Sequence, residues 1–337
     1  MATLAVLGCF VAYVLGYVFY SRYLAHKLFS LRADAVTPAH ALADGVDYVP
    51  TTRPVLFGHH FASITGLSPM LGPAIAVIWG WLPAMIWVVL GAILVGCVHD
   101  FGALTLSVRA RGMSIGVVAE KIMGKRAKSL LHVLIFFGVS LAMGVFAYVV
   151  AVLFSPEMYP QSAVPSAVIL VLALLVGWLV RHRGMHRGRL VAFAFVAVLG
   201  TVLLSDRFPV HWDSVSGWIW VLLAYAFLAS VLPVWSLLQP RDFLNSLLLY
   251  LGLGLTYLGF FVLRPEFAAP ALEPKPAGAP SMFPFVFIVV ACGAASGFHS
   301  LVGSGTTSKQ LDRETDARLI GYGGMLGESL LGLAAVL

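Results

Sequence analysis

The chain has 337 residues, of which 60% are hydrophobic and only 11% are charged, and its formal net charge is +6. A soluble domain carries about 25% charged residues, so this composition excludes an ordinary soluble enzyme or binding module. In lipid each spanning segment must be a helix or part of a closed barrel. The positive charge fits the bias of cytoplasmic membrane loops better than it fits nucleic-acid binding.

Ten apolar segments, mostly about 16–26 residues long, follow one another along the chain. A barrel strand needs only about 9–11 residues, so the segments predict helices. We call the first segment the leading helix and the other nine core helices one to nine. They cover residues 4–20, 57–79, 83–108, 130–154, 163–180, 190–204, 216–238, 243–263, 283–303 and 319–337. The predicted fold is an all-α, polytopic transmembrane bundle in a single domain, 1–337.

The distribution of Lys and Arg predicts which loops are cytoplasmic. None of the 21 basic residues lies within an apolar segment; loops on one side hold 18 of them and loops on the other side hold 3. Positive residues stay in the cytoplasm. The N-terminus and the proline-rich loop at 265–280 are therefore expected outside. The chain stops within an apolar run, which suggests the N-terminal part of a longer transporter.

Core helix one contains four helix-disturbing residues within eight positions, Gly66, Pro69, Gly72 and Pro73. Proline removes a backbone donor and clashes with the preceding turn, and glycine lowers helix propensity by about 1 kcal/mol relative to alanine. Three hydroxyl residues lie beside them: Ser63, Thr65 and Ser68. We expect a broken helix whose freed backbone lines a polar cavity. The alternative is a proline kink with close packing.

Core helices six and eight are also expected to be interrupted. Pro233 lies in helix six between Ser230 and Ser236, and helix eight is rich in small and polar residues. Helices one and six are five apart, as are the discontinuous helices of five-plus-five inverted-repeat transporters. The alternative is that these small residues only permit close packing. We predict that segments 63–73, 230–236 and 296–300 line one cavity.

Two acids are expected near mid-membrane. Asp100 lies nine residues before Arg109, about 13 Å along a helix, and Glu328 lies ten residues into core helix nine. A charge at that depth is costly and usually functional or paired. Asp100 is the first candidate for the coupling proton, with Glu328 next and with His60 or His299 as a relay. The alternative is a structural carboxylate bonded to a neighbouring helix.

No metal site or cofactor is expected. The three cysteines (Cys9, Cys97 and Cys292) each fall in an apolar run, which disfavours disulfides and paired-cysteine zinc clusters. An intramembrane metalloenzyme would need histidines on a shared helix face, but no H-x-x-x-H occurs. His59 and His60 are consecutive. His99 points about 100° away from Asp100 around a helix, so the two are not expected to form a proton pair.

Several motifs from about residue 30 to the end resemble the carbon starvation protein A family. They are D-G-V-D-Y-V-P-T (Asp44–Thr51), V-L-F-G-H-H-F-A (Val55–Ala62), G-P (Gly72–Pro73), L-P-V-W-x-L-L-x-P-R-D (Leu232–Asp242), A-C-G-A-x-S-G-F-H (Ala291–His299), S-G-T-T-x-K (Ser304–Lys309) and I-G-Y-G-G-M-L-x-E-S (Ile320–Ser329). The resemblance implies an inner-membrane transporter induced on carbon limitation, for peptides or, in close relatives, for pyruvate with protons.

The resulting hypothesis is a secondary transporter, not an enzyme, that takes up peptides or pyruvate with protons. A starvation sensor or a channel without coupled transport is the alternative. The partners expected are the substrate, protons and lipid, and the oligomeric state stays open. The residues predicted to bind substrate are Ser63, Thr65, Gly66, Ser68, Gly72, Ser230, Trp235, Ser236, Ser296, His299 and Ser300.

Overall fold

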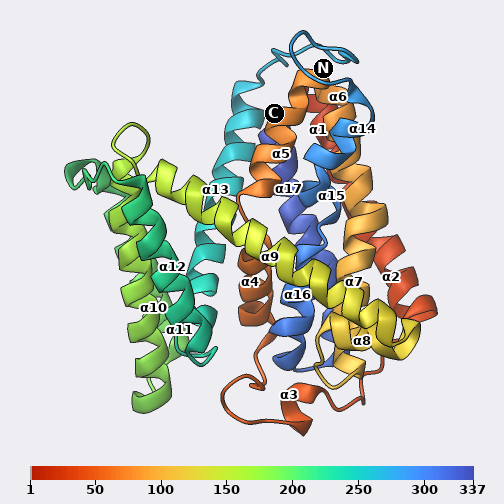
Figure 1. Cartoon of the computed structure of the whole chain (residues 1–337), viewed down its shortest axis with the longest axis vertical. Coiled ribbons are helices and arrows are strands. Elements are labelled where there is room, and N and C mark those ends of the chain that lie inside the picture. The colour runs from red at the N-terminus through yellow and green to blue at the C-terminus, as the bar shows by residue number, and fades with distance from the viewer. Residues whose placement is uncertain (1) are drawn as a thin grey trace. The chain divides into compact units, whose positions relative to one another are not determined.

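The structure is a computed structural model that describes residues 2–337, and it is helical (Figure 1). Its one β-type contact within those residues is an isolated bridge between Thr51 and Leu311. Six helical stretches are long and apolar enough to cross a membrane: Ala2–Leu28, Trp81–Arg109, Lys125–Leu153, Pro160–Arg183, Leu238–Leu263 and Glu314–Val336. The bent pair Arg53–Ile64 and Ser68–Trp79 makes a seventh span if it is counted as one. The prediction of an all-α polytopic membrane protein is confirmed.

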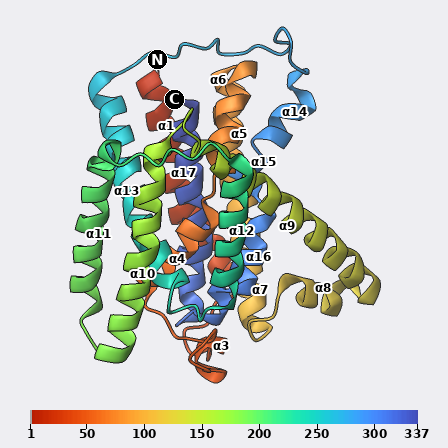
Figure 2. The ribbon, with the colours of Figure 1, turned by 60° about the vertical axis from the view of Figure 1, so that its left-hand side comes forward.

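The chain divides into two compact units. The first unit comprises Met1–Val118 and Leu248–Leu337, and the second comprises Ala119–Leu247. The helices of the second unit are α9 (Lys125–Leu153), α10 (Ala163–Arg183), α11 (Arg187–Leu203) and α12 (Val215–Val231), all visible in the turned view (Figure 2). Two helices cross the division along the chain: α8 (Ile115–Met123) and α13 (Leu238–Leu263).

The first unit holds every other helix. Its N-terminal half contains α1 (Ala2–Leu15), α2 (Ser21–Tyr23), α3 (Pro38–Ala41), α4 (Arg53–Ile64), α5 (Ser68–Ala76), α6 (Trp81–Ile86) and α7 (Cys97–Arg109). Its C-terminal half contains α14 (Met282–Val289), α15 (Ala291–Ala295), α16 (Phe298–Gly305) and α17 (Gly324–Val336). A π-helical stretch, Trp87–Gly96, joins α6 to α7, and another, Arg318–Gly323, leads into α17.

Two of the three predicted helix interruptions are confirmed as breaks. Helix α4 ends at Ile64 and α5 begins at Ser68, and the two axes differ by 52°. Core helix eight is divided into α14, α15 and α16, with an extended backbone at Ser296. The prediction that Pro233 interrupts core helix six is wrong. Helix α12 ends at Val231 and Leu232 is extended, because a residue before proline is disfavoured in the α conformation, so Pro233 follows the helix instead of interrupting it.

The largest buried apolar cluster lies in the first unit. Trp79, Phe101, Leu104, Tyr322 and Met325 are among its most deeply buried members, with at most 1% of each residue exposed. They come from α7, the π-helical segment before α17, α17 itself and the turn after α5. Helix α17 packs against both α5 and the helix Trp81–Arg109, so the segments that the breaks create are held within this core.

Glycines allow backbones to touch in this core. A side-chain carbon at Gly72 would overlap the carbonyl oxygen of Val289, and one at Gly96 would overlap that of Ala294. Gly66, by contrast, has open space where a side chain would begin, and its φ needs no glycine. Gly72 therefore has a packing role between α5 and the segment Val289–Val290.

The Gly72→Ala substitution is expected to lower the free energy of unfolding by about 1–3 kcal/mol, because the added methyl group displaces the Val289 backbone. Gly66→Ala should stay within about 0.5 kcal/mol of the parent, as surface substitutions usually do. Thermal unfolding of the two purified variants in the same detergent compares their stabilities. Equal stability of the two variants would contradict the close approach at Gly72.

One end of the first unit carries a layer of ion pairs. Arg109 binds Glu314 at 2.5 Å and Arg53 binds Asp316 at 2.5 Å, and both carboxylates are buried. The loop that contains Asp44 precedes α4 in the sequence. Its carboxylate accepts the backbone N–H groups of Val46, Tyr48 and Asp47, which lower the pKa of Asp44.

Candidate functional site

Three predicted residues meet through one imidazole ring. His299 Nδ1 lies 2.7 Å from Asp100 Oδ2, and His299 Nε2 lies 2.8 Å from Glu328 Oε2. Asp100 belongs to α7, His299 to α16 and Glu328 to α17, so each comes from a different helix of the first unit. The three residues are at most 3% exposed. We call them the carboxylate–histidine chain.

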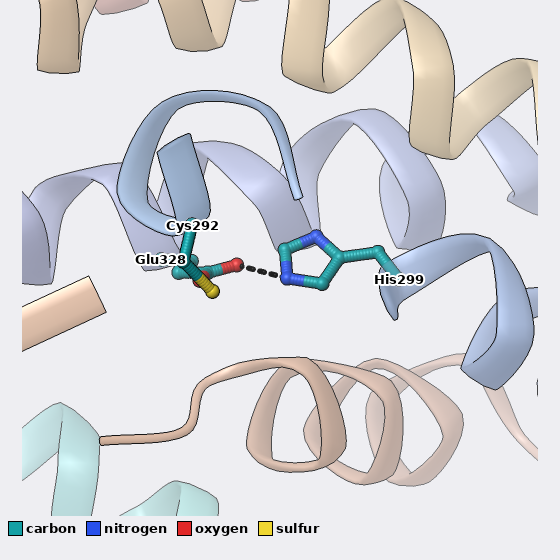
Figure 3. Close-up of side chains that lie close together, drawn as sticks. All are labelled: Cys292, His299 and Glu328. Carbon is teal, nitrogen blue, oxygen red and sulfur yellow. Dashed lines mark hydrogen bonds and ion pairs between the residues drawn. The ribbon is translucent and has the colours of Figure 1, made fainter. Parts of the chain in front are cut away.

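The two contacts of His299 differ in kind. The contact with Asp100 has the geometry of a hydrogen bond, whereas the Nε2–Oε2 contact has the distance of an ion pair without hydrogen-bond alignment. Figure 3 shows the ring of His299 facing the carboxylate of Glu328, with the thiol of Cys292 beside it. Two acids and one imidazole, buried together, can hold a shared proton whose loss or gain changes the charge of the whole chain.

His99 also contacts Asp100, which corrects the sequence interpretation. Its Nδ1 lies 3.0 Å from Asp100 Oδ1. Consecutive Cβ atoms do diverge around a helix, but the imidazole is long enough to turn back to the neighbouring carboxylate. Asp100 is consequently bonded by two histidines, and one of them, His299, belongs to a neighbouring helix. The side chain of His99 is 40% exposed, so it connects a buried acid with the surface of the unit.

His60 lies deep in the same unit, but it forms no hydrogen bond with Asp100, His299 or Glu328. Its Nδ1 pairs with Thr307 Oγ1 at 2.9 Å, and its Nε2 has no hydrogen-bond partner within residues 2–337. Thr65 Oγ1, at the break after α4, is also buried without such a partner in the described chain. The polar atoms of a bound ligand would satisfy groups of this kind, because a buried polar atom left unpaired is costly.

The other predicted residues of core helices one and eight have mixed surroundings. Gly66 is exposed, Ser63 and Ser68 are partly buried, and Gly72 is buried by backbone packing. Ser296 is buried, and the thiol of Cys292 lies 3.5 Å from its hydroxyl oxygen. Ser300 donates to the carbonyl of Gly297. Residues from both breaks thus belong to one unit.

The predicted residues of core helix six belong to the second unit. Ser230 donates to the carbonyl of Phe227, and Ser236 donates to that of Pro233. Trp235 lies beside Arg181, whose guanidinium is 5.6 Å from the ring centroid. These contacts are local ones that satisfy the side chains within their own unit. The prediction that all three segments line a single cavity stays a prediction.

Sequence reasoning missed two members of this neighbourhood, Cys292 and His99. Within the described chain, one set of possible metal ligands is formed by Cys292, His299 and Glu328, whose ligand atoms all lie within 4.8 Å of one another. Cys292 was passed over because it stands alone in an apolar run. The motif A-C-G-A-x-S-G-F-H, which carries both Cys292 and His299, was the available signal.

Comparisons with known proteins agree with the family resemblance. The family model described as "Carbon starvation protein CstA" matches residues 1–337. A peptide transporter CstA from Mycobacterium tuberculosis is 39% identical over 98% of this chain and 45% of its own length. In Escherichia coli K12, a peptide transporter CstA and a pyruvate/proton symporter BtsT are each 37% identical over 96% of this chain, covering 48% and 47% of their own lengths.

The chain therefore spans about half the length of these curated relatives. No solved structure matches it.

Proposed function

The chain belongs to the carbon starvation protein CstA family, and from that membership we propose that it serves secondary active uptake of small organic nutrients with protons. The proposed substrates are peptides or pyruvate, taken up across the inner membrane during carbon limitation. The observation that carries the proposal is the carboxylate–histidine chain, three ionisable residues buried against one another in the first unit of a membrane protein. Ionisable groups in such positions mark proton relays in transporters.

The roles proposed within the site follow from the contacts. The carboxylate–histidine chain of Asp100, His299 and Glu328 holds the coupling proton. His99 connects this carboxylate–histidine chain with the exterior of the unit. The unpaired polar atoms of His60, within α4, and of Thr65, at the break between α4 and α5, bind the polar groups of the substrate. Broken helices supply substrate sites in many transporters because their freed backbone groups face a cavity.

Uptake of labelled pyruvate and labelled dipeptides by the full-length protein in proteoliposomes tests this function. With an imposed proton gradient we expect one substrate class to accumulate, and collapse of the gradient should remove the accumulation. Counterflow without a gradient should persist, because a carrier exchanges substrate. Absence of both accumulation and counterflow for every substrate would overturn the proposal and favour a sensor.

The proposed sidedness places the N-terminus and residues 265–280 outside. Residues 270–273 bond to the backbone at Trp79, Trp81 and Leu82, at one end of the 29-residue helix Trp81–Arg109. Such a helix is about 43 Å long, so its other end, at Arg109, reaches the opposite side of a bilayer. The ion pairs of Arg109 and the basic loop after it suit the cytoplasmic side.

Single cysteines are expected to react from opposite sides when placed at Ser114 and at Ala277 in a background without the native cysteines. Both positions are exposed and both belong to the first unit. A membrane-impermeant maleimide added to intact cells should label the Ala277→Cys variant and leave Ser114→Cys unlabelled until the cells are opened. Labelling of both in intact cells would contradict the topology.

A further inference from the structure

Three side chains near the carboxylate–histidine chain offer a metal ion suitable donors. The thiol of Cys292, Nε2 of His299 and the carboxylate of Glu328 converge, with Cys292 Sγ 4.0 Å from Glu328 Oε1 and His299 Nε2 2.8 Å from Glu328 Oε2 (Figure 3). Zinc bonds to sulfur, nitrogen and oxygen donors are about 2.0–2.3 Å long, so tetrahedral donors are about 3.3–3.6 Å apart. The ligand atoms of the three residues all lie within 4.8 Å of one another, close to these separations.

The break in core helix eight makes this convergence possible. Cys292 and His299 are seven residues apart, and an unbroken helix would separate them by about 10 Å along its axis. The extended backbone at Ser296 ends α15 and lets α16 begin in a new direction at Phe298. His299 is thereby returned toward Cys292 while Glu328 approaches from α17.

Two of the donor atoms form an ion pair with each other but make no aligned hydrogen bond within residues 2–337. His299 Nε2 and Glu328 Oε2 are fully buried and have no hydrogen-bond partner in that part of the chain, although they lie close to each other. Both residues are 0% exposed. An ion between them would replace this single ion pair with a direct bond from each atom to the metal.

The surroundings of His299 also match those of a metal-binding histidine. Its other ring nitrogen, Nδ1, pairs with Asp100, which in turn contacts His99. Metal-ligating histidines usually donate the second ring N–H to a carboxylate or carbonyl, which fixes the tautomer and the ring orientation. Asp100 would hold His299 so that Nε2 faces the ion.

We propose that Cys292, His299 and Glu328 bind a divalent transition-metal ion of the zinc class. Thiolate and imidazole donors favour such ions over Mg²⁺ and Ca²⁺, which prefer oxygen. Three protein ligands leave the fourth position of a tetrahedral ion open to water or another small ligand. Cys292 is partly exposed, whereas His299 and Glu328 are fully buried. On binding, the thiol releases its proton to solvent as the sulfur–metal bond forms.

Metal binding at this group does not depend on substrate transport. It would, however, use His299 and Glu328, the residues proposed to hold the coupling proton.

Titration of the purified full-length protein with Co²⁺ in detergent tests the site by absorption spectroscopy. We expect saturation at one equivalent, a thiolate-to-cobalt charge-transfer band, and loss of the band when Zn²⁺ is added. Cys292→Ser should remove the band, and His299→Gln and Glu328→Gln should weaken binding at least about tenfold. Cys9→Ser and Cys97→Ser are the matched controls and should retain the band. A band that survives Cys292→Ser, or its absence from the parent protein, would overturn the proposal.

A second measurement avoids substitutions within the site. In a variant whose single cysteine is Cys292, micromolar Zn²⁺ should slow alkylation of that thiol by N-ethylmaleimide at least about tenfold, since a bound thiolate is not free to react. Mg²⁺ at the same concentration should leave the rate unchanged. An alkylation rate that Zn²⁺ does not alter rules out the thiol as a ligand and defeats the proposal.

Discussion

The Asp100→Asn variant is expected to exchange labelled substrate across the membrane but to lose its proton-driven accumulation. Asparagine keeps the shape of the side chain and a hydrogen bond with His299, but it cannot take up or release a proton. One proton moving down a membrane potential supplies about 2.3 kcal/mol per 100 mV, enough to concentrate substrate roughly tenfold or more. The accumulation ratio of the variant should therefore fall to about one, with counterflow retained.

Asp34→Asn is the matched control for this experiment, because it makes the same substitution in an exposed loop. It should accumulate substrate as the parent protein does. If Asp100→Asn accumulates substrate at the parental level, Asp100 does not carry the proton, and Glu328→Gln becomes the variant to test. A loss of folded protein on Asp100→Asn would instead indicate a structural carboxylate.

The His299→Leu substitution is expected to destabilise the protein by about 3–5 kcal/mol, because two buried carboxylates lose their shared partner. His99→Leu removes one contact with the same Asp100 from a side chain that is 40% exposed, and should cost no more than about 1 kcal/mol. Titration of the purified variants with a denaturing detergent in mixed micelles compares their free energies of unfolding. Equal losses of unfolding free energy in the two variants would contradict the greater role given to His299 in the carboxylate–histidine chain.

A combined variant separates loss of charge pairing from loss of packing. Adding Asp100→Asn and Glu328→Gln to His299→Leu removes both uncompensated charges, and should recover about 1–3 kcal/mol relative to His299→Leu alone. Simple additivity of the three substitutions would show that the residues do not interact and that the contacts of His299 contribute little to stability.

The helix breaks were predictable because their causes are local. Proline and glycine act on their own turn of helix, so the residues from Gly66 to Pro73 were enough to predict the break between α4 and α5. Pro233 shows the limit of this reasoning. The same residue type either interrupts a helix or follows its end, and the choice depends on where neighbouring segments pack. The depth of Asp100 in the membrane was inferred in the same local way, from its distance to Arg109, and it stays a prediction.

The composition of the site was only partly predictable, since its members are far apart in sequence. Asp100, His299 and Glu328 were each singled out, but nothing local indicates that one imidazole joins two acids separated by 228 positions. The contact of His99 with Asp100 depends on side-chain torsions that helical spacing does not determine. Cys292 gained significance only through Glu328, a residue of another helix.

The three members of the carboxylate–histidine chain lie on α7, α16 and α17, so a proton held by them would be linked to the positions of these helices. Thermodynamic linkage is reciprocal. If protonation weakens the attraction of His299 for either acid by a given free energy, separation of α16 from that acid's helix changes the affinity for the proton by the same amount. The free energy of the proton gradient would thus be coupled to movement of α16 at the break beside Ser296. No separate hinge sequence would be needed.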